Sequence, residues 1–332
     1  MFPTITINGS SELAELLALY KREMPNPNSS LASAANYHFK KPGKSFRAQL
    51  ALSTGHSLGL SRLDNLHWAA ACELLHNASL IHDDISDSST HRRGQESIHN
   101  HFGSDMALCL GDWMIAKAFE LGARNSRNGG ALVALLAQAM QDTCNGQISD
   151  ITQRECSDLA EWQRIATGKT APLLVAPIRG AAIAASLNKH AQTIKRLEGL
   201  EYIISLCGLA YQGRNDIEDI IPSSHHSSDL EGRKPNLVVS LFAHEGQGCA
   251  EFVRWYASED MRQVPYWQRR IASSDAILHA NQSVDDWLLQ AEKRVTSLPI
   301  ELQSVTQSLV CAVKQKATMA DIEGMHILEK SV

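Results

Sequence analysis

Three aspartates and two arginines fall close together in the stretch SLIHDDISDSSTHRRG, which begins at Ser79. Asp83 and Asp87 are one helical turn apart, so their carboxylates are expected to project from the same face of a helix. Carboxylates gathered in this way suit Mg²⁺, which prefers oxygen ligands and commonly joins them to substrate phosphates. Arg92 and Arg93 supply guanidinium groups that match phosphate oxygens. The spacing therefore predicts magnesium-assisted binding of a phosphorylated substrate.

This cluster could also have no function and be simply a helix end with solvated acids followed by a basic loop. This interpretation would be favoured for two adjacent aspartates alone, but not for this complete pattern at the end of an apolar helix. A second basic pair, Lys44 and Arg47 in PGKSFRAQL, is spaced by three residues at an expected helix start. Such a pair is suited to gripping an anion, although a solvated basic turn would look the same.

The bulk properties exclude several other classes of protein. The chain has 332 residues, of which 44% are hydrophobic and 20% charged, and its net charge of −5 argues against a nucleic-acid partner. Seven scattered cysteines without a CxxC spacing indicate reduced thiols and a cytoplasmic protein. The N-terminus has no basic region followed by an apolar stretch, and no apolar run approaches the roughly 20 residues that span a bilayer.

Helical periodicity dominates the elements that must position these residues. It predicts helices over 12–21, 46–58, 63–85, 106–123, 131–152, 158–187, 195–221 and 265–279, with more helix after 300. Gly, Ser and Pro gather in the breaks at 25–30, 86–94, 125–130 and 222–228. None of these breaks is long enough to be an interdomain linker, so we expect one all-α domain over residues 1–332.

The segment from His76 to Asp87, followed by Arg92, Arg93 and Gly94, resembles the first aspartate-rich motif of trans-polyprenyl diphosphate synthases. The resemblance extends from about Lys41 to Leu241. It implies an isoprenoid synthase helical bundle around a deep apolar cavity, a homodimer and three Mg²⁺ ions. The implied reaction is head-to-tail condensation of an allylic prenyl diphosphate with isopentenyl diphosphate. On this reading Asp83, Asp84 and Asp87 hold metal, and Arg92 faces the allylic diphosphate.

Further short motifs match the same family. PGKSFRAQL resembles its GKxxRP element, with Ala48 where proline is usual. The resemblance implies that Lys44 and Arg47, together with His76 and Arg93, hold isopentenyl diphosphate. GKTAPLL resembles the family's KT element. There Lys169 would contact phosphate, and Thr170 would offer oxygen lone pairs beside the nascent cation.

The second aspartate-rich motif, usually FQxxDDxxD, is matched by YQGRNDIEDI with two departures. Tyr211 replaces phenylalanine and Asn215 replaces the first aspartate, while Gln212, Asp216 and Asp219 are retained. The resemblance implies that Asn215, Asp216 and Asp219 face the metal. An Asn amide brings no negative charge, and one lost ion pair at about 4 Å is worth roughly 4 kcal/mol at an effective dielectric near 20. We therefore expect weaker metal binding on this side.

Two more segments complete the resemblance. DLEGRKPNL places Lys234 where the family has a further phosphate-binding lysine, with Arg233 where glycine is common. CNGQISDI resembles a GQxxD variant of the family, with Gln147 and Asp150 expected to face the cavity.

Product length depends on residues just before the first motif. Ala78 and Ser79 are small and are expected to line the cavity where the growing tail descends, so the pocket should be open beyond C15. Large side chains deeper in the cavity, at Trp113 or Leu75, could limit its depth. We expect a product of about C20, and longer products stay open as an alternative. Close helix packing is the plain alternative role for Ala78.

Two other functions remain open from the sequence. A class I terpene cyclase, or another prenyl transfer on the same scaffold, is suggested by Asn215. It would not need the isopentenyl diphosphate residues Lys44, Arg47, His76 and Arg93, which are all present. A non-catalytic partner subunit would be expected to lose the first aspartate-rich motif, which is intact.

Overall fold

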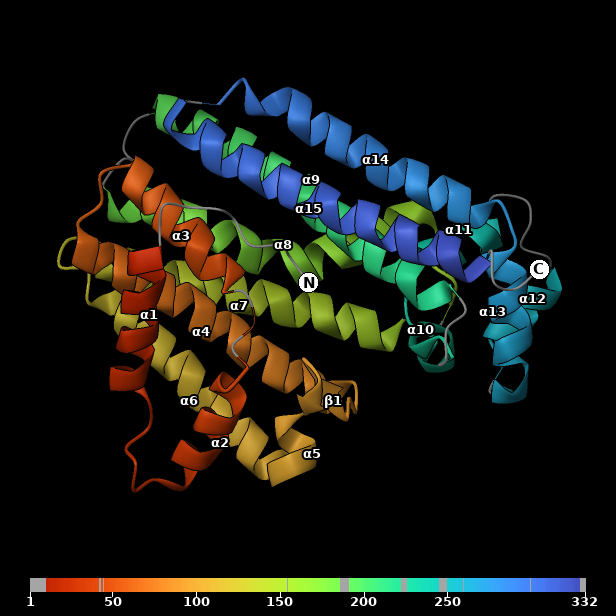
Figure 1. Ribbon diagram of the computed structural model, residues 1–332, viewed down its shortest axis with the longest axis horizontal. Coiled ribbons are helices and arrows are strands. Elements are labelled where there is room, and N and C mark those ends of the chain that lie inside the picture. The colour runs from red at the N-terminus through yellow and green to blue at the C-terminus, as the bar shows by residue number, and fades with distance from the viewer. Residues whose placement is uncertain are drawn as a thin grey trace.

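Helices build nearly all of the computed structural model, which describes residues 10–41, 43, 45–153, 155–185, 191–221, 226–244, 250–258, 260–298 and 300–328 (Figure 1). The N-terminal half contains α1 (Ser10–Glu23), α2 (Ser30–Phe39), α3 (Phe46–Ser57), α4 (Arg62–Ser86), α5 (Ile98–Phe102), α6 (Ser104–Ala123) and α7 (Gly129–Thr152). The C-terminal half contains α8 (Leu159–Ala184), α9 (Ala191–Ile220), α10 (Ser228–Gly232), α11 (Leu237–His244), α12 (Ala250–Tyr256), the 3₁₀ turn η2 (Met261–Gln263), α13 (Val264–Ala272), α14 (Ala276–Val295) and α15 (Ile300–Leu328).

Polar side chains fix where several of these helices begin. Ser29, Ser61 and Asp158 precede α2, α4 and α8, and each side chain accepts a hydrogen bond from a backbone N–H of the first turn. Such caps satisfy donors that a helix cannot pair internally. They orient two of the helices, α4 and α8, that carry the predicted site.

Two large apolar clusters form the core, and α8 contributes to both. One cluster joins α8 to α9, α11, α13 and α14, and includes Leu174 and Ile178. The other joins α8 to α1, α4 and α6, and includes Leu173 and Ala176. Neighbouring residues of α8 therefore point into different clusters, which places this helix between the two halves of the chain.

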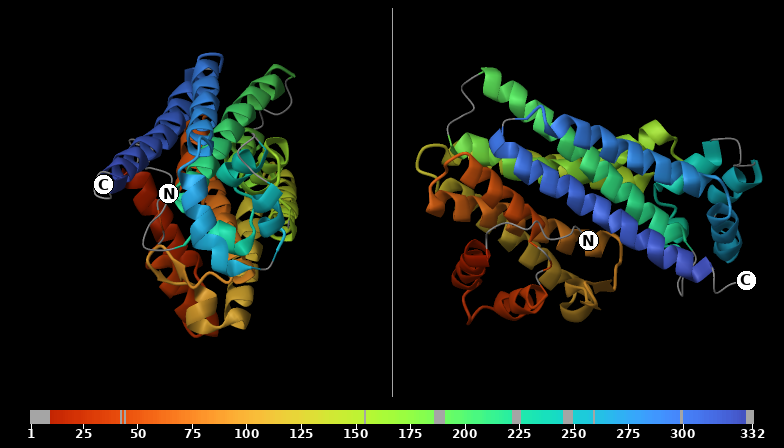
Figure 2. Two further views of the ribbon diagram at one scale, coloured as in Figure 1. Left: turned by 90° about the vertical axis from the view of Figure 1, so that its right-hand side faces the viewer. Right: turned by 45° about the horizontal axis from the view of Figure 1, so that its top comes forward.

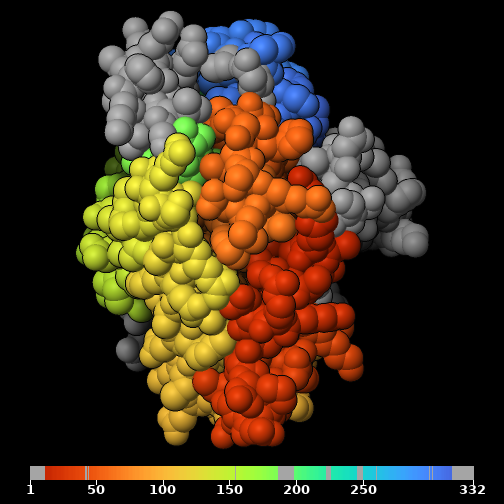
Figure 3. Space-filling model, turned by 90° about the vertical axis from the view of Figure 1, so that its left-hand side faces the viewer, coloured from red at the N-terminus to blue at the C-terminus, as the bar shows by residue number. Residues whose placement is uncertain are grey.

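The long helices run side by side in layers. α9, α14 and α15 pack together on one side, while α4 packs on α3 and α6, and α7 packs on α8 (Figures 1 and 2). At one end, the N-terminal segments in red and orange lie against the yellow α6–α7 segment (Figure 3). In Figure 1 the β1 strand lies beside α5 at the lower edge, and α10 lies nearer the end formed by α12 and α13.

The all-α expectation is confirmed, with local differences. α2 was not predicted, and the expected 265–279 helix is divided into α13 and α14 by residues 273–275. The expected break at 86–94 carries a short antiparallel pair, β1 (His91–Arg92) with β2 (Gln95–Glu96). Of the helices that the structure describes, none has an apolar stretch sufficient to cross a bilayer.

Candidate active site

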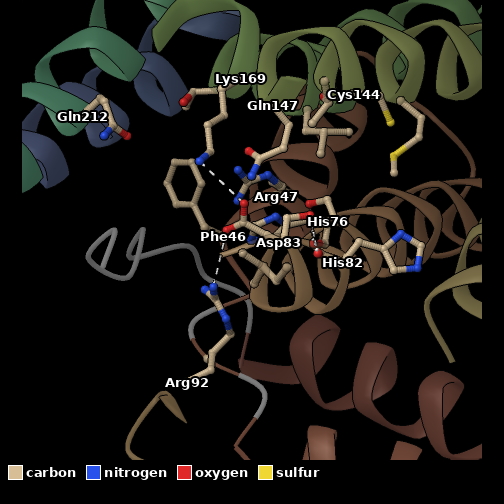
Figure 4. Close-up of a pocket in the computed structure, with 18 of the residues that line it drawn as sticks. Phe46, Arg47, His76, His82, Asp83, Arg92, Cys144, Gln147, Lys169 and Gln212 are labelled. Carbon is tan, nitrogen blue, oxygen red and sulfur yellow. Dashed lines mark hydrogen bonds and ion pairs between the residues drawn. The ribbon is translucent and has the colours of Figure 1, made fainter. Parts of the chain in front are cut away.

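A cavity of about 620 Å³ lies between α4, α7, α8 and α9 (Figure 4). Its polar lining includes Arg47, Glu73, His76, Asp83, Arg92, Arg93, Gln147, Lys169, Thr170, Tyr211, Gln212 and Asn215. Its apolar lining includes Phe46, Leu80, Met140, Ile148, Ile151 and Leu173. Most of the residues predicted to do chemistry thus converge on one cavity, although they come from segments far apart in the sequence.

Asp83 and Asp87 lie at the C-terminal end of α4, each facing a lysine from another element. Asp83 Oδ1 is 3.5 Å from Lys169 Nζ of α8, and Asp87 Oδ1 is 2.9 Å from Lys234 Nζ just after α10. Asp83 lines the cavity, whereas Asp87, one helical turn further on, lies just outside the lining. The two lysines balance part of the negative charge that would otherwise destabilise the helix end.

Asp84 does not share the position of Asp83, although we expected both to hold metal. It is buried and does not line the cavity, and its Oδ1 accepts a hydrogen bond of 2.7 Å from Arg92 Nε. Burial raises the pKa of Asp84, and Arg92 opposes that shift. Successive residues of a helix point in different directions, so Asp84 turns toward the hairpin while Asp83 turns toward the cavity.

A tight turn presents the two arginines. β1 and β2 are joined by Arg93 and Gly94, whose φ angles of 54° and 69° are both positive, as in a type I′ hairpin. The left-handed conformation costs a non-glycine residue about 1–2 kcal/mol, and such strain is often found at functional sites. Arg93 Nη1 donates a hydrogen bond of 3.1 Å to the carbonyl of Lys41.

Gly43 leaves the space that the Arg93 guanidinium occupies. Its φ is +74°, and a Cβ added there would lie 2.8 Å from Arg93 Cζ. An alanine at this position would therefore be strained in its backbone and would also push Arg93 out of place. Lys44, the next residue in the predicted anion grip, lies outside the described residues, so its position is left as an expectation.

Arg47 and His76 both line the cavity. Arg47 is a cationic hydrogen-bond donor, and His76 is a neutral one. Arg47 is 8% exposed and its Nε has no hydrogen-bond partner among the described residues. Burial lowers the pKa of Arg47 to about 10, so it stays charged at neutral pH. Burial, helped by the charges of Arg47 and Arg93, holds the pKa of His76 well below its usual range. A charged guanidinium with an unpaired Nε beside a cavity suits an anionic ligand.

Glu73 is a cavity residue that the sequence interpretation missed. It is 2% exposed, and its carboxylate accepts a hydrogen bond of 3.1 Å from the backbone N–H of Ala48. Arg47 attracts the Glu73 carboxylate, although burial raises its pKa overall. The available signal was its position three residues before His76, which places both side chains on one helical face.

Lys169 crosses the cavity toward both α4 and α7 (Figure 4). Its Nζ donates a hydrogen bond of 2.8 Å to Asp150 Oδ2 and lies 3.5 Å from Asp83 Oδ1. Burial disfavours the charge on Lys169, but the attraction of Asp83 and Asp150 outweighs burial and raises its pKa. Thr170 follows Lys169 on α8 and lines the same cavity, as does Gln147 of α7. Asp150 is outside the lining, so it acts by holding Lys169.

A close approach of two glycines sets the separation of α7 and α8 beside Lys169. A Cβ added to Gly146 would lie 2.4 Å from the backbone carbon of Gly168. The backbones of α7 and α8 thus come closer than any side chain would allow. This contact fixes Gln147 and Lys169, the next residues on each helix, at the same level of the cavity.

Asp216 departs from the predicted metal-facing position. It is 1% exposed and absent from the cavity lining. Its Oδ2 accepts hydrogen bonds of 2.8 Å from Trp162 Nε1 and 2.7 Å from the Leu237 backbone N–H, and its Oδ1 accepts one of 2.8 Å from Gln212 Nε2. Turning the carboxylate toward the cavity would leave buried donors unpaired, at about 1–3 kcal/mol each. Asp216 therefore joins α8, α9 and α11.

Asp219 is likewise engaged away from the cavity. Its Oδ1 accepts hydrogen bonds of 3.0 Å from the Ser228 N–H and 2.9 Å from the Ser228 hydroxyl. Its Oδ2 accepts from the Ser227 hydroxyl and from the Asp229 N–H. These donors begin α10, so Asp219 holds the start of that helix. We expected Asp219 to face the metal; in the structure its carboxylate oxygens accept these hydrogen bonds instead.

The face of α9 that does line the cavity carries Tyr211, Gln212 and Asn215. Tyr211 and Asn215 are one helical turn apart and share a hydrogen bond between their side chains. Burial raises the pKa of Tyr211, so its phenol stays protonated at neutral pH. The two departures from the family motif are therefore in contact with each other, and this wall bears no ionised group.

Lys234 and Arg233 have separate positions. Lys234 reaches Asp87 and is outside the cavity lining. Arg233 adopts a left-handed φ of 52°, and its guanidinium carbon lies 4.0 Å from the centre of the Trp255 ring. Arg233 thus packs in the fold while Lys234 reaches the first aspartate-rich motif.

The two residues predicted to set product length are not equivalent. Ser79 lines the cavity and its hydroxyl donates a hydrogen bond of 2.8 Å to the carbonyl of His76. Ala78 is fully buried in the apolar core and does not line the cavity. The burial of Ala78 favours its plain alternative role, close helix packing. Leu75 is also fully buried, so it does not bound the cavity directly.

The oxygen donors fit a hard divalent cation on one wall only. Asp83 and Asp87 provide carboxylates of the kind that Mg²⁺ prefers. The opposite wall offers the neutral Asn215, because Asp216 and Asp219 are engaged elsewhere. Among the described residues, no three His, Cys, Asp or Glu side chains converge as a metal-binding group. A cation at Asp83 and Asp87 would take its remaining ligands from a bound substrate or from water.

Known proteins share both the sequence and the fold. A family model described as Polyprenyl synthetase matches residues 28–267. The geranylgeranyl pyrophosphate synthase of Geoglobus acetivorans is 28% identical over 287 residues, covering 83% of this chain and 86% of that relative. A solved structure of a geranylgeranyl pyrophosphate synthase has a TM-score of 0.81 at 21% identity, covering 95% of this chain and 99% of its own.

A polyprenyl synthase from Caulobacter crescentus CB15, solved in complex with calcium and isoprenyl diphosphate, has a TM-score of 0.78 at 23% identity. The similarity covers 91% of this chain and 94% of that one. At these low identities the similarity to solved structures shows the fold alone. The family model matches most of the sequence and therefore shows the family. The chain belongs to the polyprenyl synthetase family, which confirms the resemblance of its motifs.

Proposed function

We propose that this chain condenses an allylic prenyl diphosphate head-to-tail with isopentenyl diphosphate, in a magnesium-dependent reaction, to give a trans-prenyl diphosphate of about C20. The observation that carries the proposal is the convergence of two polar sets on one cavity that also has apolar walls. Asp83 and Lys169 form one set, and Arg47, His76 and Arg93 form the other. One set suits a diphosphate that departs, and the other suits a diphosphate that is retained.

The allylic substrate would place its diphosphate near Lys169 and Arg92. As the C–O bond breaks, negative charge grows on the departing pyrophosphate, and preorganised cations there lower the barrier to ionisation. Asp83 and Asp87 would hold the magnesium, which supplies further charge to that leaving group when bound. Asp150 keeps the Lys169 ammonium group directed into the cavity through its hydrogen bond of 2.8 Å.

Isopentenyl diphosphate would lie against Arg47, His76 and Arg93. The two guanidinium groups neutralise its diphosphate, and the neutral His76 imidazole adds a hydrogen bond without adding charge. The double bond attacks the allylic cation, a carbon–carbon bond forms, and a proton leaves to the released pyrophosphate. Leu80, Ile151 and Leu173 provide apolar walls that keep water from the cation.

A product of about C20 is supported by the small residue Ser79 on the α4 wall, beside a lining that includes Met140 and Ile148. We also propose one isoprenoid synthase domain over residues 1–332, since α8 joins both apolar clusters. We also propose a homodimer, as the resemblance implies, and a cytoplasmic location, which the free thiols of the described cysteines support.

The test is turnover by the purified chain with Mg²⁺ and geranyl or farnesyl diphosphate, with and without isopentenyl diphosphate. We expect longer diphosphates only when both substrates are present, and none after chelation of the metal. Asp83→Asn should lower the rate at least a hundredfold, whereas Asp105→Asn, an exposed acid on α6, should have no effect. Hydrocarbons or alcohols from the allylic substrate alone would instead indicate a cyclase.

A further inference from the structure

The α9 wall of the cavity is electrically neutral in a site built for a diphosphate and divalent cations. Its lining residues are Tyr211, Gln212 and Asn215, and the amide of Gln212 already donates to Asp216. The carboxylates of Asp216 and Asp219 are occupied by donors from α8, α10 and α11. Neither is free to turn into the cavity while those contacts persist.

Such a wall offers a divalent cation no carboxylate ligand. Mg²⁺ binds in proteins chiefly through carboxylates and substrate phosphates, and keeps water elsewhere. Asn215 can offer an amide oxygen, but one neutral ligand gives no charge to offset the cost of partial dehydration. The same two side chains suit a phosphate oxygen better, because a phenol and an amide are hydrogen-bond donors.

We propose that Tyr211 and Asn215 contact the diphosphate directly as hydrogen-bond donors, so that the chain holds two divalent cations, both on the Asp83 and Asp87 wall, instead of three. The inference rests on the proposed function. Tyr211 and Asn215, the two departures from the second aspartate-rich motif, would then act together. Their side chains already share a hydrogen bond on one helical face. The pair would replace a cation bridge with direct contacts.

The test counts metal ions in the full-length protein, using Mn²⁺ and inorganic pyrophosphate as probes. Bound Mn²⁺ is measured by electron paramagnetic resonance of the free ion, and its positions by anomalous diffraction from crystals soaked in both. We expect two Mn²⁺ ions per chain, both beside Asp83 and Asp87. Asn215→Asp should bring the count to three, with the added ion beside residue 215.

Two further variants sharpen the result. Tyr211→Phe should keep two ions but weaken pyrophosphate binding about tenfold, as expected for the loss of one hydrogen bond to a charged group. Glu218→Gln removes an exposed carboxylate of the same helix that does not line the cavity, and should change neither quantity. Loss of an ion in that variant would show that Glu218 is a ligand and would overturn the inference.

Three ions in the unaltered protein would also overturn it while leaving the proposed function intact. So would unchanged pyrophosphate affinity in Tyr211→Phe. Failure of the unaltered protein to retain either Mn²⁺ or pyrophosphate would count against the proposed function itself, and the inference would fall with it. The two failures are therefore distinguishable in one set of measurements.

Discussion

Lys234 Nζ lies 2.9 Å from Asp87 Oδ1, which ties the segment after α10 to the end of α4. Lys169 makes the corresponding contact with Asp83 from α8, at 3.5 Å. Asp83 and Asp87, two of the three carboxylates of the first aspartate-rich motif, thus each have a lysine partner from a distant part of the chain. A divalent cation that binds these carboxylates must compete with the ammonium groups or direct them onto the diphosphate.

The turn that presents Arg93 should be sensitive to Gly43. Gly43→Ala should raise the KM for isopentenyl diphosphate about tenfold, because the new Cβ would displace the Arg93 guanidinium, while the KM for the allylic substrate changes little. Gly59→Ala is the matched control, since Gly59 has a φ of +70° but nothing within 4 Å of an added Cβ. Equal kinetic effects of the two variants would contradict the explanation.

The contact between α7 and α8 should resist any added side chain. Gly146→Ala should destabilise the protein by about 1–3 kcal/mol and lower kcat, because the helices must separate beside Lys169. Gly130→Ala, also on α7 but with nothing within 4 Å, should be neutral or stabilising. Chemical denaturation and steady-state kinetics measure both effects. A stable, fully active Gly146→Ala enzyme would disprove the close-approach argument.

Stability should fall in acid through His38. Burial lowers its pKa from 6.5 to about 4 in the folded state, where its Nε2 lies 2.8 Å from Asn77 Oδ1. Between these values the unfolded chain binds a proton that the folded chain does not. The free energy of unfolding therefore decreases as the pH falls through this window, by about 3 kcal/mol in total. This contribution is fully present above pH 6.5.

Urea denaturation at several pH values measures the effect. His38→Gln should reduce the slope of stability against pH between about 4 and 6.5. An unchanged slope in this variant would assign the acid sensitivity to other groups.

Product length should respond to Ser79 and not to Ala78. Ser79→Phe places an aromatic ring on the cavity wall and should shorten the main product to C15 or less. Ala78→Val should instead overpack the core, lowering stability by about 1–3 kcal/mol without changing the product distribution. Chromatography of dephosphorylated products distinguishes the two. A shorter product from Ala78→Val would restore our first expectation for that position.

Local pattern was enough to predict most of the helices and the face that Asp83 presents. Periodicity gave α3, α4, α6 and α7 to within a few residues, because each has an apolar side that a neighbour covers. α2 was missed because it is short and follows directly on a break rich in proline and serine. A local motif also predicted the basic turn, but not its left-handed Arg93.

Long-range contacts set the orientation of side chains that the motifs alone could not predict. The orientation of Asp216 depends on Trp162 and on the backbone of Leu237, neither of which is near it in the sequence. The resemblance placed Asp216 and Asp219 toward the metal because it reads residue types and spacing only. The direction of a carboxylate is set by the donors that fold around it, and those lie on other helices.

The position of α8 between the two apolar clusters has a consequence for how the enzyme could accommodate its substrates. Because α8 packs into both clusters, a shift of this helix would disturb every layer of the bundle. Lys169 and Thr170 are therefore expected to keep their positions when substrates bind. Any closing movement on binding must therefore come from shorter peripheral pieces, such as the β1–β2 hairpin or the segment around Lys234. In the proposed reaction, the residues assigned to the departing pyrophosphate would stay in place while the rim of the cavity adjusts around them.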